Sequence, residues 1–473
     1  MTIPPSVRQL GLFIVLILVF LAPSCKRRTT AEFIVIKDPV IALKHIRVID
    51  GTGEVVREDQ TIIIESGRIA AIGPTAQINV PPSATSLDLS GHTAIPGLVG
   101  MHEHLFYAID GGDRYVKAPE SFAPLYLAAG VTTIRTAGAL DLDTDQYVKR
   151  SVDKGRLAGP KIHLSSLYID RRAGDLVNPQ KVAKVINEWA DQGITSLKIY
   201  ENINGTEIKS IVDAAHQRGL KVTGHVCAAG FVEAAQAGID NLEHGLAVDT
   251  EFFSRKKAGE CPQRSEWLPE LARIDVQSEP VQRMIRELVI RRVAVTSTLA
   301  VFESFVKEKF ELDPRMQDVL TEDALADCRT SLAEGKKDPR WSKLWEVVLK
   351  KEMEFEREFV KAGGLLMTGV DPTGWGGVVA GFGDQRGVEL LVQAGFPPEE
   401  AIRIATLNGA MFLGEDSRIG TLATGKQADI VIVRGNPAAN IRDIRNVQLV
   451  FKDGVGYDPA KLIESVRGMV GEK

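Results

Sequence analysis

The chain has 473 residues, of which 44% are hydrophobic and 25% charged, and its net charge at pH 7 is -5. This composition is that of a globular protein with ample core, built either as two or three domains or as one large barrel with an appendage. The acidic balance and the well-mixed charges argue against nucleic acid as a partner.

An apolar segment near the N-terminus predicts export. Residues 11–22 form an unbroken apolar run after Arg8, which is too short for a membrane span of roughly 20 residues but is typical of a signal peptide. The run ends in Leu21-Ala22-Pro23-Ser24-Cys25, which resembles a bacterial lipoprotein signal. We therefore predict a signal peptide over residues 1–25 and a periplasmic or lipid-anchored envelope protein, in which a lipid on Cys25 would be the only membrane contact. Simple cleavage to a soluble periplasmic protein and a signal anchor of opposite orientation are the alternatives.

Two segments far apart in the sequence have the pattern of β-strands. In the first, residues 61–64 and 68–72 flank Glu65-Ser66-Gly67 and predict a hairpin. In the second, residues 428–433 and 447–451 are mostly apolar, and Lys452-Asp453-Gly454 is a further turn signal. Since each set has too few strands to bury both faces alone, we expect them to join in one small β-sandwich.

Between these segments, strands alternate with helices. The first strand ends in His102-Glu103-His104, and the apolar residues Ile208, Ile211, Val212 and Ala215 have helical spacing. The other seven expected strands are residues 131–135, 161–164, 195–200, 221–225, 240–244, 293–297 and 365–371. Eight strands with intervening helices predict an α/β protein with a (β/α)₈ TIM barrel. Residues 301–360 are predicted to be a helix-rich insertion near the barrel mouth.

These patterns divide the chain into a signal peptide and two units. Residues 33–97 and 412–473 are expected to form the two halves of the sandwich, and residues 98–411 are expected to form the barrel.

Chemically reactive side chains gather at the expected strand ends. Side chains alternate along a strand, so the first two histidines face the same way. In a barrel of this kind the chemistry lies at the C-terminal ends of the strands. The residues found there are His102, His104, Lys198, His225, His244 and Asp371. Imidazoles with a carboxylate suit Zn²⁺ or another borderline divalent metal.

Together these motifs resemble the amidohydrolase superfamily, including its imidazolonepropionase-like and prolidase-like members. The resemblance rests on Pro96-Gly97-Leu98-Val99 before the two histidines, Gly130-Val131-Thr132-Thr133, Leu197-Lys198-Ile199-Tyr200, Gly224-His225, Leu242-Glu243-His244-Gly245, Gly369-Val370-Asp371, residues 405–410 and residues 420–430. It covers nearly everything from residue 40 to residue 455.

The resemblance implies a site with two divalent metal ions, most simply Zn²⁺. His102, His104 and Asp371 would hold one ion, His225 and His244 would hold the other, and carboxylated Lys198 would bridge both. Two cations would lower the pKa of water to roughly 7, and Asp371 would accept its proton and pass it to a leaving amine. A structural lysine, paired with Asp371 or a glutamate, is the alternative for Lys198.

Other residues are weaker candidates for substrate contacts. Tyr107, Arg135, His163 and Tyr200 lie near strand ends, and Arg135 could bind a substrate carboxylate, although an arginine there could equally form a structural ion pair. Some dipeptide-cleaving relatives have a tyrosine where this chain has Cys227, which weakens a dipeptidase assignment. If Cys25 carries lipid, an odd number of cysteines remains. Cys261 and Cys328 could form a disulfide, or all three could be free.

The leading hypothesis is a metal-dependent hydrolase that cleaves an amide-like C–N bond of a small molecule, with dipeptides or N-acyl amino acids as the first candidates. The alternatives are a cyclic amidase or deaminase of the imidazolonepropionase type, and a non-catalytic metal-binding envelope protein. A cation facing the metals would favour a substrate with a carboxylate. Homo-oligomer formation is left open.

Overall fold

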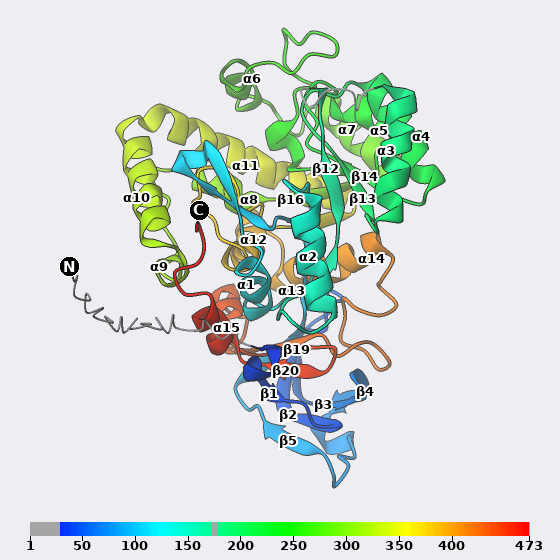
Figure 1. Ribbon diagram of the computed structural model, residues 1–473, viewed down its shortest axis with the longest axis vertical. Coiled ribbons are helices and arrows are strands. Elements are labelled where there is room, and N and C mark those ends of the chain that lie inside the picture. Colours follow the sequence, from blue (N-terminus) through cyan, green and yellow to red (C-terminus); the bar gives the residue numbers. More distant parts are fainter. Residues whose placement is uncertain (1–28, 172–177, 473) are drawn as a thin grey trace, which may run out of the picture.

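The computed structural model describes residues 29–171 and 178–472 (Figure 1). The predicted signal peptide, with Cys25, lies outside these residues. Within them, no helix combines the length and the apolar character that a membrane crossing requires.

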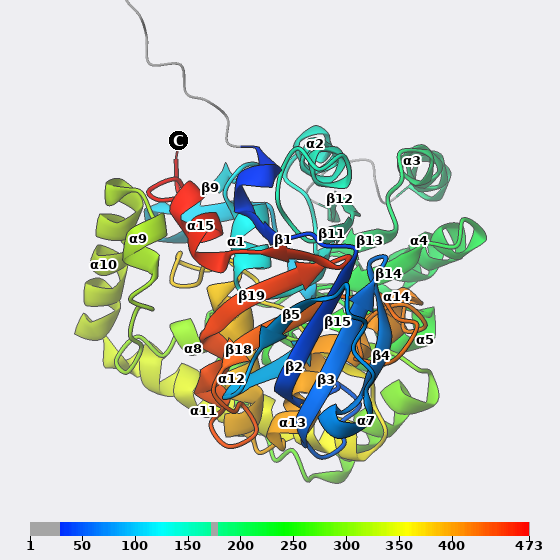
Figure 2. The ribbon, with the colours of Figure 1, turned by 90° about the horizontal axis from the view of Figure 1, so that it is seen from below.

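The two β-rich segments form one sheet of nine strands at one end of the molecule (Figures 1 and 2). The order is β1-β20-β19-β18-β6-β2-β3-β4, with β5 also paired to β2. The strands are β1 Ile34–Ile36, β2 Val40–Val48, β3 Arg57–Glu65, β4 Arg68–Pro74, β5 Thr85–Asp88, β6 His92–Pro96, β18 Ile430–Arg434, β19 Val447–Lys452 and β20 Val455–Tyr457.

The join between the two halves of the chain is the antiparallel pair β6 and β18, in which Ile95 lies opposite Val431. This confirms the predicted pairing of the terminal segments. The expected sandwich is instead a single hydrogen-bonded sheet, because β6 pairs with β2 as well as with β18. Ile41, Ile62 and Phe451 are among the residues of its own apolar core.

The parallel strands form two arcs. One has the order β11-β10-β7, and the other has the order β12-β13-β14-β15-β16-β17. The strands are β7 Leu98–Glu103, β10 Val131–Thr136, β11 Lys161–His163, β12 Ser165–Ile169, β13 Ser196–Ile199, β14 Lys221–Gly224, β15 Asn241–Glu243, β16 Ala294–Ser297 and β17 Leu366–Thr368.

The barrel prediction is therefore confirmed in part. Each segment expected to be a barrel strand contains one, but the described residues form no continuous ring of paired strands. The chain leaves the ladder at Leu164, between β11 and β12. Across the other junction, the Asp371 amide donates to the His102 carbonyl at 3.0 Å, which brings the chain beyond β17 against β7.

Helices follow most of the parallel strands. They are α1 Phe122–Ala128, α2 Leu142–Asp153, α3 Pro179–Asp191, α4 Gly205–Gln217, α5 Phe231–Ala237, α7 Glu279–Ile290 and α12 Phe382–Ala394. The predicted apolar face of α4 is buried. The N-terminus of α4 is closed by a capping box between Asn204 and Glu207, which satisfies backbone N–H groups that the first turn leaves free.

The predicted insertion is helical and contributes to the barrel mouth. It contains α8 Leu299–Ser304, α9 Met316–Val319, α10 Glu322–Lys337 and α11 Pro339–Lys361. Helix α6, Arg264–Leu271, lies at the end of the molecule away from the nine-stranded sheet (Figure 1). The remaining elements include the hairpin of β8 Phe106–Ile109 with β9 Arg114–Lys117, and the helices α13 Pro398–Arg403, α14 Gly409–Leu413 and α15 Pro459–Ser465.

The suggested disulfide between Cys261 and Cys328 is wrong. Cys227 pairs with Cys261, with their Cα atoms 5.1 Å apart. Cys328 is buried and free, with its Sγ 3.1 Å from the carbonyl oxygen of Gly376. Cys328 lies in α10, whereas the loop after β14 brings Cys227 to Cys261.

Candidate metal centre

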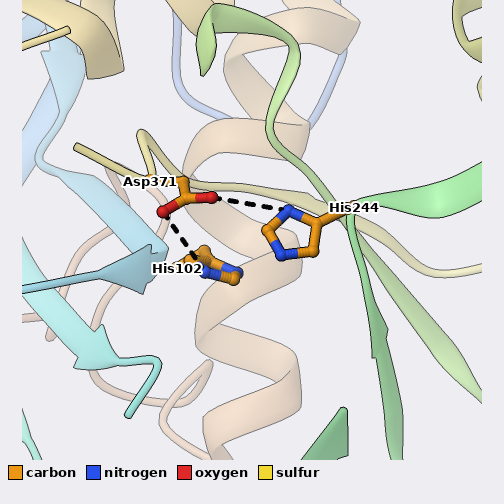
Figure 3. A group of neighbouring side chains, drawn as sticks. All are labelled: His102, His244 and Asp371. Atoms are coloured by element: carbon orange, nitrogen blue, oxygen red, sulfur yellow. Dashed lines mark ion pairs between the residues drawn. The ribbon is translucent and has the colours of Figure 1, made fainter. Parts of the chain in front are cut away.

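Three predicted metal ligands face one another at the ends of β7, β15 and β17. Asp371 lies 3.8 Å from His102 Nε2 through Oδ1 and 3.6 Å from His244 Nδ1 through Oδ2 (Figure 3). One ligand atom from each residue lies within 4.8 Å of the others, and all three side chains are buried. This spacing is compatible with a single shared cation.

The other two predicted histidines adjoin this group. His104 Nε2 lies 3.4 Å from Asp371 Oδ1. The His225 ring centroid is 4.5 Å from that of His244, and His244 in turn lies 4.4 Å from His102. The structure therefore brings together all four histidines and the aspartate.

In two of the histidines, a hydrogen bond at Nδ1 determines which ring nitrogen is available to bind a metal. His102 Nδ1 donates to Glu243 Oε2 at 2.7 Å, and His104 Nδ1 lies 3.2 Å from the carbonyl oxygen of Gly138, which can only accept. The protons are thus on Nδ1, and the Nε2 lone pairs point toward the carboxylate of Asp371. Lone pairs that converge with no proton between them fit a divalent cation.

Glu243 is an important residue that the sequence analysis missed. It is fully buried, and Oε1 accepts from Arg135 Nη2 at 2.6 Å and from the hydroxyl of Thr223. Burial raises the pKa of Glu243, but Arg135, Lys198 and His102 outweigh it and hold that pKa well below its usual value. An ionised Glu243 orients the His102 ring, as a carboxylate behind a metal-binding histidine does.

Lys198 lies in the same interior, where it is 1% exposed, and its Nζ has no hydrogen-bond partner among the described residues. Burial lowers the pKa of Lys198 to about 8, although the charges of Glu243 and Asp371 oppose this shift. Carboxylation requires a neutral amine, so the lowered pKa favours that modification. The structure records no ion pair of Lys198 within the described ranges, which is an observation against the purely structural alternative.

The protonation states suit metal binding. Burial, with the charge of Lys198, lowers the pKa of His102 to about 4 and that of His225 well below its ordinary value. Burial and the neighbouring His102 also lower the pKa of His244 well below its ordinary value. Burial would raise the pKa of Asp371, but the surrounding imidazoles hold it well below its usual value. Neutral imidazoles and an ionised carboxylate are the forms that bind a divalent metal.

The backbone is unusual at two of these positions. His244 has φ 70° and Asp371 has φ 46°, both in the left-handed region that non-glycine residues rarely adopt. Gly369 precedes Asp371, and a Cβ there would overlap the backbone nitrogen of His102. The chain after β17 therefore packs directly on β7, which brings Asp371 to His102.

Above the predicted ligands lies a cavity of about 550 Å³. Its lining includes Lys198 and all five predicted imidazole and carboxylate ligands. Aromatic side chains form much of the remaining wall: Phe106, Tyr115, Tyr168, Tyr200, Phe302, Phe305 and Trp345. Arg264 and Asp170 also line it.

Of the four predicted substrate contacts, Tyr200 alone lines the cavity. Arg135 is fully buried and forms the ion pair with Glu243. His163 lies 3.4 Å from Glu415, and the Tyr107 hydroxyl donates to the carbonyl of Gly376. These three side chains are therefore occupied by structural contacts. Arg135 donates to Asn241 and to Glu243. These two residues share one face of β15, because side chains alternate along a strand, and this alternation could have indicated where Arg135 points.

Comparison with known proteins identifies the family of the chain. Residues 93–254 and 325–455 match the amidohydrolase family model, and the chain belongs to this family of hydrolases. It is 26% identical over 232 residues to adenine deaminase of Chelativorans sp. (strain BNC1), covering 46% of this chain and 36% of that protein. It is 37% identical over 106 residues to imidazolonepropionase of Nocardia farcinica (strain IFM 10152), covering 22% of this chain and 26% of that protein.

These alignments span about a third or less of the curated relatives. Among solved structures, the fold is similar to a putative prolidase from Bifidobacterium longum, with a TM-score of 0.65. That alignment is 23% identical and covers 90% of this chain and 98% of the other. The similarity extends to the whole architecture, a TIM-barrel type with a β-rich flanking part.

Proposed function

We propose that this protein is a metal-dependent hydrolase that cleaves an amide-like C–N bond of a small molecule. The observation that carries the proposal is the convergence of four imidazoles, Asp371 and the unpartnered Lys198 on the floor of one cavity. Membership of the amidohydrolase family supports it.

The residues present fit two divalent metal ions, with Zn²⁺ as the first choice. His102, His104 and Asp371 would hold one ion, His225 and His244 the other, and Lys198, once carboxylated, would bridge them. When bound, such ions lower the pKa of water and polarise a scissile carbonyl. Glu243 and the Gly138 carbonyl keep two of the imidazoles in the required tautomer.

Asp371 would serve as the proton carrier. Its low pKa leaves the carboxylate ionised, so Oδ1 or Oδ2 can accept a proton and return it to the leaving nitrogen. The aromatic wall formed by Phe302, Phe305 and Trp345 would exclude water and hold an apolar group of the substrate. Dipeptides and N-acyl amino acids are small amides of this kind.

A second candidate is a cyclic amidase or deaminase. The local similarity to imidazolonepropionase and adenine deaminase favours it. The two candidates give different products, since a deaminase releases ammonia and a peptidase releases a larger amine.

The test is hydrolysis of pooled dipeptides and N-acyl amino acids, cyclic amides and aminopurines, before and after chelation and metal re-addition. Metal-dependent amine release that Asp371→Asn lowers about 10²- to 10⁴-fold would support the leading proposal. Ring opening or ammonia release would support the second candidate. No turnover of any pool by folded, metal-loaded protein would contradict both.

We also propose an exported protein. The disulfide between Cys227 and Cys261 supports this, because disulfides persist mainly in oxidising compartments. Fractionation with and without residues 1–25 would test export, and mass spectrometry of the mature N-terminus would show whether Cys25 carries lipid.

A further inference from the structure

Among the described residues, Arg264 is the one arginine that lines the cavity, and it lies at the start of α6. Its side chain is exposed, in contrast to the fully buried Arg135. None of the carboxylates in the described part of the chain lies within ion-pair distance of the Arg264 guanidinium. Of the two acids of the lining, Asp371 faces the imidazoles. Asp170 accepts from Asn202 through Oδ2 at 3.0 Å, and its buried Oδ1 has no hydrogen-bond partner among the described residues.

Arg264 lines the same cavity as the predicted metal ligands. Two tyrosines of the cavity wall, Tyr115 and Tyr200, belong to the same lining. An arginine in this lining that has no acidic partner among the described residues is available to an anionic group in the cavity.

The segment that carries Arg264 is fastened beside His225. Cys227 follows His225 by two positions, and its disulfide partner Cys261 precedes Arg264 by three. The carbonyl oxygen of Cys227 also accepts from Thr250 Oγ1 at 2.6 Å and from Lys256 Nζ at 2.9 Å. The tether therefore joins the loop after β14 to the loop before α6.

The far side of this segment is anchored in the core. Trp267 and Leu268 of α6 are 4% and 0% exposed. Glu270 accepts from the amide and the hydroxyl of Ser254, at 2.9 Å and 3.1 Å. With one end bonded to Cys227 and the other packed, the start of α6 has little freedom to leave the cavity mouth.

We propose that Arg264 determines specificity by binding the carboxylate of the substrate, and that the Cys227–Cys261 disulfide positions it for this contact. The inference rests on the proposed hydrolase function and narrows its substrate to amides that bear a carboxylate. A guanidinium can donate two parallel hydrogen bonds to a carboxylate, which gives both affinity and orientation. The carboxylate would lie at the mouth, with the scissile amide toward the floor.

The direct test compares binding of N-acyl amino acids with binding of the same compounds as carboxamides, by calorimetry on the metal-loaded protein. The aromatic wall makes the N-acetyl derivatives of phenylalanine and leucine suitable probes. In wild type the acid should bind about tenfold to a hundredfold more tightly than the amide. Arg264→Gln should abolish this preference, and Arg264→Lys should keep part of it. Arg273→Gln, which removes an exposed arginine outside the cavity lining, should leave it unchanged.

The disulfide is tested by reduction of wild type and by the double variant Cys227→Ala with Cys261→Ala. Either change should reduce the preference for the acid. In the Arg264→Gln protein neither change should reduce the preference further, because the disulfide acts through Arg264. A merely structural disulfide would weaken binding of acid and amide equally. Thermal unfolding establishes that each protein is folded, and reduction of the wild type replaces the double variant if that variant fails to fold.

Equal binding of acids and amides by wild type, or no saturable binding of any acid, would overturn the role of Arg264. Loss of acid and amide binding in equal measure after reduction would overturn the role of the disulfide. Hydrolysis of the same acids and amides is measured in a separate assay. Acid preference without turnover would contradict the proposed function alone, and turnover of acids and amides at equal rates would contradict the present inference alone.

Discussion

Glu243→Gln should weaken both the fold and the metal centre. Glu243 is fully buried and accepts hydrogen bonds from His102 at 2.7 Å, from Arg135 at 2.6 Å and from Thr223. Glutamine preserves the shape but removes the charge, so the buried Arg135 loses its ionised partner. Removing one partner of a buried ion pair typically costs about 3–5 kcal/mol in the free energy of unfolding. Loss of a carboxylate that orients a metal-binding histidine typically costs about 10- to 100-fold in metal affinity.

The two effects can be separated with a second substitution. Urea unfolding would give the stability of each variant, and competition with a chelating dye would give the metal affinity. Arg135→Met combined with Glu243→Gln should recover stability relative to Glu243→Gln alone, because the buried guanidinium that lost its ionised partner is removed. It should not recover metal affinity, because His102 still lacks its carboxylate. Glu266→Gln, an exposed site on α6, serves as the control. A Glu243→Gln protein with unchanged stability and unchanged metal affinity would refute this reasoning.

Two further predictions concern the same region. In Gly369→Ala, the new Cβ would overlap the His102 backbone nitrogen; we expect a loss of about 1–3 kcal/mol in stability and a lower metal content, and normal values in both urea unfolding and metal analysis would contradict the packing described here. In the native protein the pKa of His102 is lowered to about 4, so between about pH 6.5 and pH 4 the unfolded chain binds a proton on His102 and the native protein does not. The metal-free protein should therefore lose stability as the pH falls over that range. Urea unfolding at several pH values should show this slope in wild type and a shallower slope in His102→Gln, and equal slopes would count against the buried neutral imidazole.

Much of the candidate site is predictable from sequence because its residues lie at strand ends. His102, His225, His244 and Asp371 each follow a short apolar or β-branched run, and parallel strands bring those ends together. The strand-end pattern alone did not show which way Arg135 points; the alternation along β15, which gives Asn241 and Glu243 one face, is the signal that could have indicated it. That side chain turns into the barrel interior, where Glu243 and Asn241 bind it.

The features that the sequence did not reveal depend on contacts between distant segments. Arg264 follows a long loop, and the disulfide that fastens this loop joins residues 34 positions apart. Cysteine pairing depends on three-dimensional geometry, which spacing alone does not determine. The break at Leu164, which divides the parallel strands into two arcs, likewise has no turn signal in the sequence.

We propose that the converging side chains bind two divalent metals on which hydrolysis depends. The most direct test is metal analysis of the protein without residues 1–25, beside Lys198→Ala, with hydrolysis of the pooled amides as the second readout. We predict about two metal ions per chain in wild type, and loss of both bridged metal and activity in Lys198→Ala. Folded wild-type protein without stoichiometric metal, or a Lys198→Ala variant that keeps both ions and full activity, would contradict the account.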